Sequence, residues 1–338
     1  MPLALIRGKR GALVGALLLA IGLILPFVPG VYVVFAIDLV CFALVAVAFD
    51  MLLGFTGLLS FGHALFWGGA GYVATIAIAH GVTSFPVAVL AGVAYAAVLS
   101  LAVGALAVRR SGIFFAMITL AIGQIQYFLA FQFVDFTGGE NGLNVPTRGT
   151  LFGLRLDNDF VYYYLALAFA AIGTAFAVRV VTSPFGAVLA AMRENENRAK
   201  SIGYDTTRFK LAAFVMSGTL AGVAGALFSI GNRLAGLDGV DWHTSGAIVI
   251  MTILGGIGTI YGPIVGAALY ESLDFFVSKT AIGDKTNIVM GLIFAIVILV
   301  ARRGVVGEML HRAFAKKQLV EDEDQPGRLV VDPGAEAV

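Results

Sequence analysis

The sequence predicts an all-α polytopic membrane protein with about ten transmembrane segments. Of its 338 residues, 59% are apolar and 13% are charged, and this charged share is about half of what soluble domains carry. The mean hydropathy is +0.93, and apolar runs long enough to cross a bilayer recur along the chain. A soluble domain is excluded because too little polar surface is present to cover it, and disorder is excluded because the chain is too hydrophobic.

Charge and the scarcity of metal-binding residue types exclude further classes. The chain has 22 basic and 21 acidic residues, a net charge of +1, whereas a nucleic-acid partner requires a basic excess or stripe. The single cysteine, Cys41, lies in an apolar run and forms neither an intrachain disulfide nor a metal cluster. The four histidines are scattered and supply no convergent acid, base and nucleophile for an enzyme. We therefore expect no catalytic residue, no metal, no cofactor and no nucleic-acid partner.

Four apolar spans account for the first third of the chain: Gly11–Val28, Val31–Leu53, Ala64–Ala79 and Phe85–Val108. Basic residues precede the first span, as they also do in a secretory signal. No small-x-small cleavage site follows that span, and the next span begins almost at once. We therefore interpret Gly11–Val28 as a retained first helix.

Five further apolar runs follow, at Ile113–Val134, Val161–Val181, Phe209–Ile230, Ala247–Val277 and Ile288–Ala301. The run Ala247–Val277 has 31 residues, which exceeds the ~20 residues that one helical crossing needs. A glycine cluster interrupts it in the middle. Two crossings in this run bring the expected total to about ten.

Basic residues set the expected orientation, because Lys and Arg gather on the cytoplasmic side. With Arg7, Lys9 and Arg10 inside, ten crossings also place inside the basic residues of 109–110, 184–210 and 302–303. The acidic stretch Asp135–Asp159 then lies outside. Both termini are predicted to be cytoplasmic, with residues 1–10 as the N-terminal segment, 11–301 as the membrane domain and 302–338 as a disordered tail.

Two glycine-rich segments interrupt apolar spans, and they resemble one another. Leu53-Gly54-x-x-Gly57 matches Leu254-Gly255-x-x-Gly258, and an aromatic residue and another glycine follow each. Irregular backbone at membrane depth is tolerated only against protein or a wet cavity, and paired interrupted spans are typical of transporters. Glycine is also common in close-packed membrane helices, so the pattern favours transport only moderately. The predicted broken-helix hinges are Gly54, Gly57, Gly255, Gly258, Gly262 and Pro263.

Few polar residues lie within the spans. Four of them, at or near irregular or small-residue segments, are the candidate substrate-pathway residues: Ser60, His63, Thr119 and Gln124. Three acids lie near predicted span ends, where a charged side chain reaches the interface at little free-energy cost: Asp50, Glu271 and Asp274. Asp38 lies deeper in its span. For each acid a packing role is at least as good an interpretation as a substrate contact. No chain of acids and bases crosses the membrane, which counts against an ion-driven carrier.

The loop 184–208 is expected to carry a short amphipathic helix over Ala187–Ile202. Pro184 precedes it and Gly203 follows it, which suits a helix start and stop. Charges of both signs border a predicted apolar stripe of Val188, Ala191, Met192, Ala199 and Ile202. Such a helix lies on lipid or fits a groove in a partner, and the mixed charge favours a protein partner. The sequence has no G-x-x-x-x-G-K-[ST] phosphate loop, so ATP-driven work would need another subunit.

Five blocks of sequence occur in an order that points to one family. They are LLGFTGLLSFGHALF at Leu52–Phe66, RSGIFFAMITLA at Arg110–Ala121, TGGENGL at Thr137–Leu143, Arg193–Gly203, and Thr252–Pro263. Together they resemble the branched-chain amino acid ABC-transporter permeases of the LivM kind, over about Leu39–Ala301. The resemblance implies a permease subunit of the bacterial inner membrane that imports branched-chain or other hydrophobic amino acids.

The same resemblance implies partners and a coupling element. The partners would be a homologous second permease, two cytoplasmic ATPase subunits that hydrolyse the ATP, a periplasmic solute-binding protein and the surrounding lipid. The coupling helix that inserts into the ATPase would carry Arg193, Glu194, Asn195, Arg198 and Gly203. Asp50 departs from the family, which often has asparagine there. Related permeases carry urea, short-chain amides or other amino acids, and an ion-gradient-driven secondary carrier is the alternative from a different class.

Overall fold

The computed structural model describes residues 9–279, 291–292, 294–295, 304 and 308. Most of the predicted last span, Ile288–Ala301, lies outside the described residues. So do residues 1–8 of the predicted N-terminal segment and all of the predicted tail except 304 and 308.

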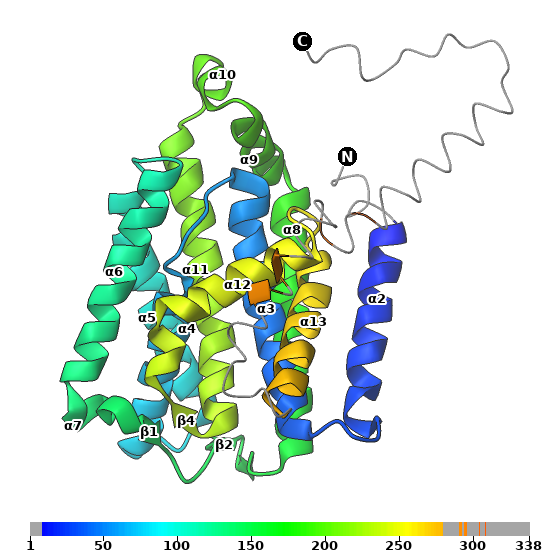
Figure 1. Ribbon diagram of the computed structural model, residues 1–338, viewed down its shortest axis with the longest axis vertical. Coiled ribbons are helices and arrows are strands. Elements are labelled where there is room, and N and C mark those ends of the chain that lie inside the picture. The colour runs from blue at the N-terminus through cyan, green and yellow to red at the C-terminus, as the bar shows by residue number, and fades with distance from the viewer. Residues whose placement is uncertain (1–8, 280–290, 293, 296–303, 305–307, 309–338) are drawn as a thin grey trace, which may run out of the picture.

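Helices make up most of the described chain, as the sequence predicts (Figure 1). The long ones are α2 (Lys9–Ile24), α3 (Val33–Thr56), α4 (His63–Ala79), α5 (Phe85–Ala107), α6 (Ile113–Gln132), α8 (Asp159–Thr182), α11 (Thr206–Asn232), α12 (Trp242–Gly255) and α13 (Gly262–Ser278). Short elements are η1 (Leu25–Phe27), α7 (Val134–Thr137), η2 (Gly139–Asn141), α9 (Pro184–Glu194), α10 (Glu196–Ser201) and η3 (Leu237–Val240). Five helices (α3, α5, α6, α8 and α11) are long and apolar enough to cross a membrane, and shorter apolar helices cover Gly11–Phe27, His63–Ala79 and Trp242–Gly255.

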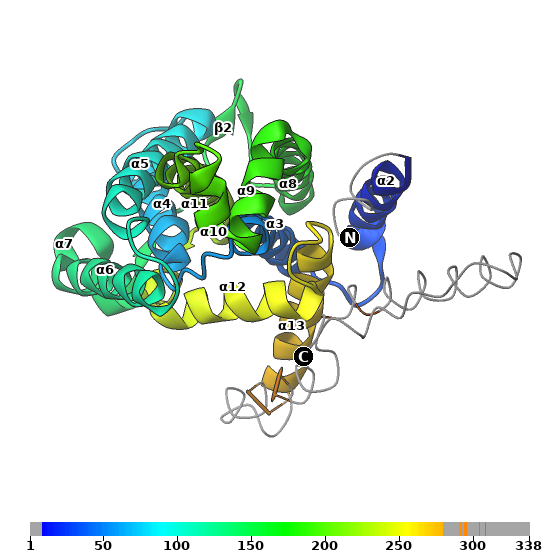
Figure 2. The same cartoon turned by 90° about the horizontal axis from the view of Figure 1, so that it is seen from above.

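Helices α3 and α11 form the centre of the bundle. They pack against each other and against α4, while α5 and α8 cover their other sides and α12 runs obliquely across α3, α4 and α6 (Figure 2). Helices α9 and α10 project from one end of the bundle, and α2 stands at its edge (Figures 1 and 2). Among the five helices that are long and apolar enough to cross a membrane, α3 and α11 are the most buried.

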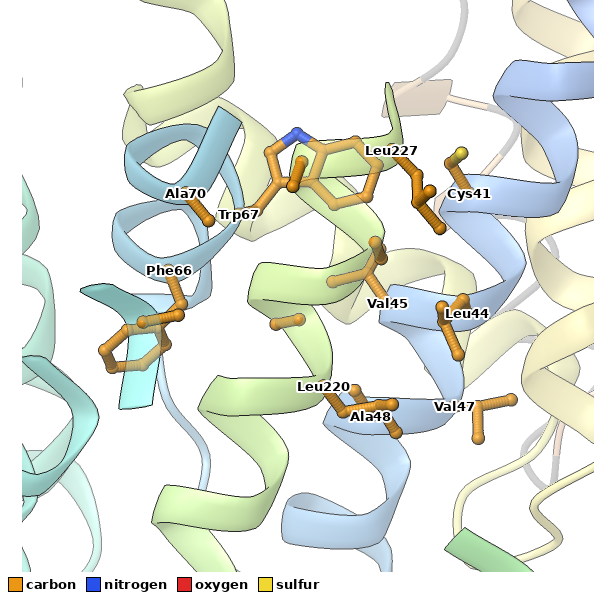
Figure 3. Packing of buried hydrophobic residues seen from close by; sticks show 14 of the residues in the cluster. Cys41, Leu44, Val45, Val47, Ala48, Phe66, Trp67, Ala70, Leu220 and Leu227 are labelled. Carbon is orange, nitrogen blue, oxygen red and sulfur yellow. The ribbon is translucent and has the colours of Figure 1, made fainter. Parts of the chain in front are cut away.

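Small and large apolar side chains interlock in this core. Figure 3 shows Phe66, Trp67 and Ala70 of α4 beside Leu220 and Leu227 of α11, with side chains of α3 from Cys41 to Ala48 on the far side. The residues Val45–Phe49 are 0% exposed. By contrast α5, α6 and α8 present large apolar residues outward, such as Leu90, Phe114 and Ile172. Both the core and the outer surface are therefore apolar, as a protein surrounded by lipid requires.

The predicted outer stretch Asp135–Asp159 is not helical throughout. Strand β1 (Leu143–Asn144) pairs antiparallel with β4 (Leu234–Ala235), with Leu143 opposite Ala235. Strand β2 (Thr150–Leu151) pairs with β3 (Leu154–Arg155) in a small hairpin. These strands close the end of the bundle opposite α9 and α10 (Figure 1).

Candidate functional site

The first glycine-rich segment separates α3 from α4. Helix α3 ends at Thr56 because Gly57 adopts a left-handed conformation at φ 74°, and its N–H donates to Leu53 O at 3.1 Å. The chain stays non-helical to Gly62. Backbone N–H groups of this segment that lack a helical partner are hydrogen-bonded to side chains. The Gly62 N–H donates to Ser60 Oγ at 3.2 Å, and the Ala64 N–H donates to Ser245 Oγ of α12 at 2.9 Å. An irregular backbone at this depth needs such partners.

The second glycine-rich segment separates α12 from α13. Helix α12 ends at Gly255, Pro263 stands in the first turn of α13, and the residues between turn sharply, with Gly258 at φ 79° and Ile260 at φ 58°. Thr259 stabilises this turn through two hydrogen bonds. Its hydroxyl donates to Gly256 O at 2.7 Å and accepts from the Gly262 N–H at 3.0 Å.

Asp50 joins the second segment to α3. Its carboxylate accepts from the Gly258 N–H at 2.6 Å through Oδ1 and from the Ile260 N–H at 3.0 Å through Oδ2. The packing role predicted for Asp50 is therefore confirmed, and the alternative of a position at the interface is wrong, since its side chain is 0% exposed. An aspartate suits this position because a carboxylate offers an acceptor oxygen to each N–H, whereas an amide offers only one.

Arg193 reaches the same place from α9. One guanidinium N–H, at Nη1, donates to Gly54 O near the end of α3, where the last carbonyls of a helix have no partner within it. Gly54 itself touches the second segment, since a Cβ there would lie 2.7 Å from Gly258 Cα and N. We call the set Asp50, Gly54, Arg193, Gly258 and Ile260 the glycine junction. It brings both glycine-rich segments and α9 to one point.

The loop 184–208 holds two helices rather than the single predicted helix Ala187–Ile202. Asn195 is extended, at φ −155° and ψ 100°, and its side chain caps α10 by accepting from the Arg198 N–H at 2.9 Å. The break changes the phase of the buried face. Gly186, Leu189 and Met192 are buried on α9 and Ala199 on α10, whereas Ala191 is exposed and Ile202 is 71% exposed, so the predicted stripe is only partly correct.

All five predicted coupling residues are exposed. Arg193 also reaches the glycine junction through its guanidinium, and Gly203, at φ 100°, follows the end of α10. Glu194 and Arg198 are exposed, and their side chains form no hydrogen bond or ion pair within the described part of the chain. They are the free charges on this surface.

Glu196 ties α10 to the start of α11. Its carboxylate lies 2.6 Å from Lys210 Nζ and 3.0 Å from Lys200 Nζ, and it accepts from the Thr206 hydroxyl at 3.1 Å. Burial alone would raise the pKa of Glu196, but the hydrogen bonds and charges of Lys210 and Lys200 outweigh it and lower the pKa to about 2. The carboxylate is therefore ionised at neutral pH and holds the two-helix loop in place.

Three of the predicted pathway residues gather around the first segment. The Phe61 N–H donates to Thr119 Oγ1 at 3.2 Å, and Gly62 packs on the Thr119 backbone. Ser60, His63 and Thr119 are 0%, 0% and 1% exposed. Gln124 lies further along α6 and is half-buried, and its Nε2 has no hydrogen-bond partner in the described part of the chain. The first three are thus enclosed by packed protein in this conformation.

His63 belongs to a hydrogen-bonded link between three helices. Ser217 of α11 donates its hydroxyl proton to Ala48 O at 2.5 Å, so its oxygen accepts from His63 Nε2 at 2.9 Å. The proton of the imidazole therefore sits on Nε2, and Nδ1 is buried without a hydrogen-bond partner among the residues that the structure describes. The rings of Phe49, Phe66 and Phe214 surround the imidazole at 4.7–6.4 Å between centroids.

Sequence reasoning missed the roles of Glu196 and Lys210, and for Asp50 it offered a packing role but not the segment that the side chain contacts. The i,i+4 spacing of Glu196 and Lys200 carries a signal for one ion pair. The contacts of Asp50 with a segment about 208 residues away have no local signal.

Comparison with known proteins identifies a matching family and several relatives. The model of a family described as the permease component of branched-chain amino acid transport systems matches residues 31–301. The LivM permease protein of the high-affinity branched-chain amino acid transport system of Salmonella typhimurium is 27% identical over 252 residues, 68% of this chain and 59% of the relative.

Two archaeal relatives from Methanocaldococcus jannaschii are similar as well. A probable LivM permease protein is 27% identical over 208 residues, 58% of this chain and 59% of the relative. A probable LivH permease protein is 31% identical over 120 residues, 35% of this chain and 37% of the relative. This chain spans about three fifths of the length of the LivM relatives that it matches. No solved structure matches it.

Proposed function

The chain belongs to the family of branched-chain amino acid transport permease components, and from this membership we propose that it is the permease subunit of an ATP-driven importer. It forms the translocation pathway for branched-chain or other hydrophobic amino acids in the bacterial inner membrane. A homologous second permease, two cytoplasmic ATPase subunits and a periplasmic binding protein complete the complex. The names of the LivM and LivH relatives support the substrate class and the second permease.

The glycine junction is the observation that best supports coupling to an external motor. Arg193 of α9 is exposed but donates to Gly54 O, while Glu194 and Arg198 are exposed without such a contact in the described part of the chain. A partner bound to the exposed charges of Glu194 and Arg198 would move α9, and Arg193 would transmit that movement to the end of α3. Because Gly54 packs on Gly258, the same movement acts on both glycine-rich segments.

Displacement of the junction would open the buried pathway residues. Ser60, His63 and Thr119 lie next to the first glycine-rich segment and are closed in the present packing. Interfaces that are packed in this way switch between discrete arrangements instead of deforming gradually. We therefore assign Gly54, Gly57, Gly255, Gly258, Gly262 and Pro263 as the hinges of this switch.

The transport proposal is tested with the assembled complex in proteoliposomes. Uptake of labelled leucine should require both ATP inside and the binding protein outside, and it should persist when ionophores remove sodium and proton gradients. Uptake that follows an ion gradient without the ATPase subunits would contradict the proposal and establish a secondary carrier. The ligand recovered with the binding protein separates amino acids from urea or short-chain amides.

A further inference from the structure

A cleft of about 880 Å³ separates α2 from the rest of the bundle. Its walls come from α2, α3, α8 and the start of α13, and apolar side chains such as Leu18, Leu44 and Leu167 line most of it. Figure 2 shows α2 standing apart from the other helices. Two hydrogen bonds hold α2 at the end away from α9, from Tyr163 Oη to Gly22 O at 2.5 Å and from Tyr164 Oη to Leu23 O at 3.1 Å.

Positive charge marks the other end of the cleft. Arg179, in the last turn of α8, lines it and is exposed. Its guanidinium pairs with no acidic side chain among the residues that the structure describes. Helix α2 begins at this same end of the bundle (Figure 1). The cleft is thus apolar along its length and basic at the surface that the distribution of Lys and Arg assigns to the cytoplasm.

We propose that this cleft binds an anionic phospholipid of the cytoplasmic leaflet. The acyl chains lie along the apolar walls, and the phosphate contacts Arg179. Buried methylene groups supply most of the affinity, and the basic end supplies preference for a negatively charged headgroup. This binding does not depend on the proposed transport function.

One protein occupant, the predicted last span of this chain, fits less well. The described residue Phe294, from the predicted last span, packs elsewhere, since its ring stacks on Tyr270 at 5.1 Å and it clusters with Leu254. Tyr270 is not on the wall of the cleft, where α13 contributes Ile264, Val265 and Ala268.

The lipid would also contact a neighbour of the glycine junction. Tyr261 lines the cleft and follows Ile260, whose N–H donates to Asp50. A lipid in the cleft would therefore touch the second glycine-rich segment next to a residue that Asp50 binds.

Native mass spectrometry of the purified full-length chain tests the proposal, with phosphatidylglycerol or phosphatidylethanolamine of equal acyl length added to the detergent. We expect phosphatidylglycerol to bind more tightly, and Arg179→Gln to weaken it about fivefold, from the stabilisation that one basic residue gives an anionic lipid. Arg110→Gln, an exposed arginine outside the cleft, is the matched control and should bind normally.

A second pair of variants separates the cleft from the headgroup contact. Ala171→Phe places a ring in the cleft and should reduce retention of both lipids, whereas Ala105→Phe, on an exposed position of α5, should not. Size-exclusion profiles confirm that each variant remains folded. Equal lipid retention by Arg179→Gln and Arg110→Gln, or by Ala171→Phe and Ala105→Phe, would overturn the proposal.

Discussion

Replacement of Asp50 by asparagine tests the glycine junction with the smallest possible change. The variant keeps the size of the side chain but leaves one acceptor oxygen for two backbone N–H groups, which now lie 2.6 and 3.0 Å from the carboxylate. The amide NH₂ would face the other N–H, so one hydrogen bond to a charged group is lost and two donors oppose each other.

The expected magnitude follows from that count of hydrogen bonds. A hydrogen bond to a charged group contributes about 1.5–3 kcal/mol, and the site is fully buried, so water does not replace it. At about 1.4 kcal/mol for each factor of ten, the second glycine-rich segment should open roughly 10- to 140-fold more often. The rest of α12 and α13 should keep its packing.

Hydrogen–deuterium exchange of peptides covering 256–261 measures this opening directly. Amides in that segment should exchange faster in Asp50→Asn by the factor above, because local opening governs their exchange. Asp135→Asn, an exposed aspartate in α7 at the other end of the bundle, is the matched control. If exchange over 256–261 is equal in the two variants, the carboxylate does not hold the segment and the reasoning is wrong.

Other predictions concern the two-helix loop and the core. The pKa of Glu196 is lowered from 4.5 to about 2. The carboxylate therefore stabilises the folded state fully above about pH 4.5, and this stabilisation is lost as the pH falls from there to about 2. Thermal unfolding measured against pH should show the loss in the wild type and not in Glu196→Gln. Glu196→Gln should cost about 3 kcal/mol and Lys210→Met about 1 kcal/mol, because the buried Lys210 would lose its carboxylate whereas Glu196 keeps Lys200; equal losses in denaturant titrations would contradict this asymmetry. Ser217→Ala should cost about 1–3 kcal/mol, since it leaves groups of Ala48 and His63 unpaired, and a melting temperature equal to that of the wild type would contradict the hydrogen-bonded link.

The spans were predictable from sequence because lipid imposes one strong local rule. Every backbone group must be paired inside its own segment, so crossings appear as long apolar helices, and α3, α5, α8 and α11 lie close to the predicted ranges. The two helix interruptions were visible for the same reason, since glycine clusters interrupt otherwise continuous apolar runs. Hydropathy shows where an apolar span is interrupted, but not which residues contact the interruption.

The glycine junction itself was not predictable. An aspartate near the end of an apolar span resembles a residue at the interface, and Asp50 is buried only because a segment about 208 residues away folds over it. The break at Asn195 was also missed, because the residues on both sides favour a helix and its extended backbone is set by capping and by the Glu196–Lys210 pair. A tertiary contact decides the first feature, and a local cap together with a tertiary ion pair decides the second.

The transport stoichiometry of Arg193→Gln tests the central claim most directly. In proteoliposomes that hold the assembled complex, leucine taken up and ATP hydrolysed are measured together for the wild type, Arg193→Gln and Arg198→Gln. We predict that Arg193→Gln still hydrolyses ATP but imports less leucine per ATP, because its link to Gly54 O is lost. Arg198→Gln, an outward charge on the same loop, should weaken assembly and leave the ratio unchanged. A wild-type ratio in assembled Arg193→Gln complexes would contradict the role of the glycine junction in coupling.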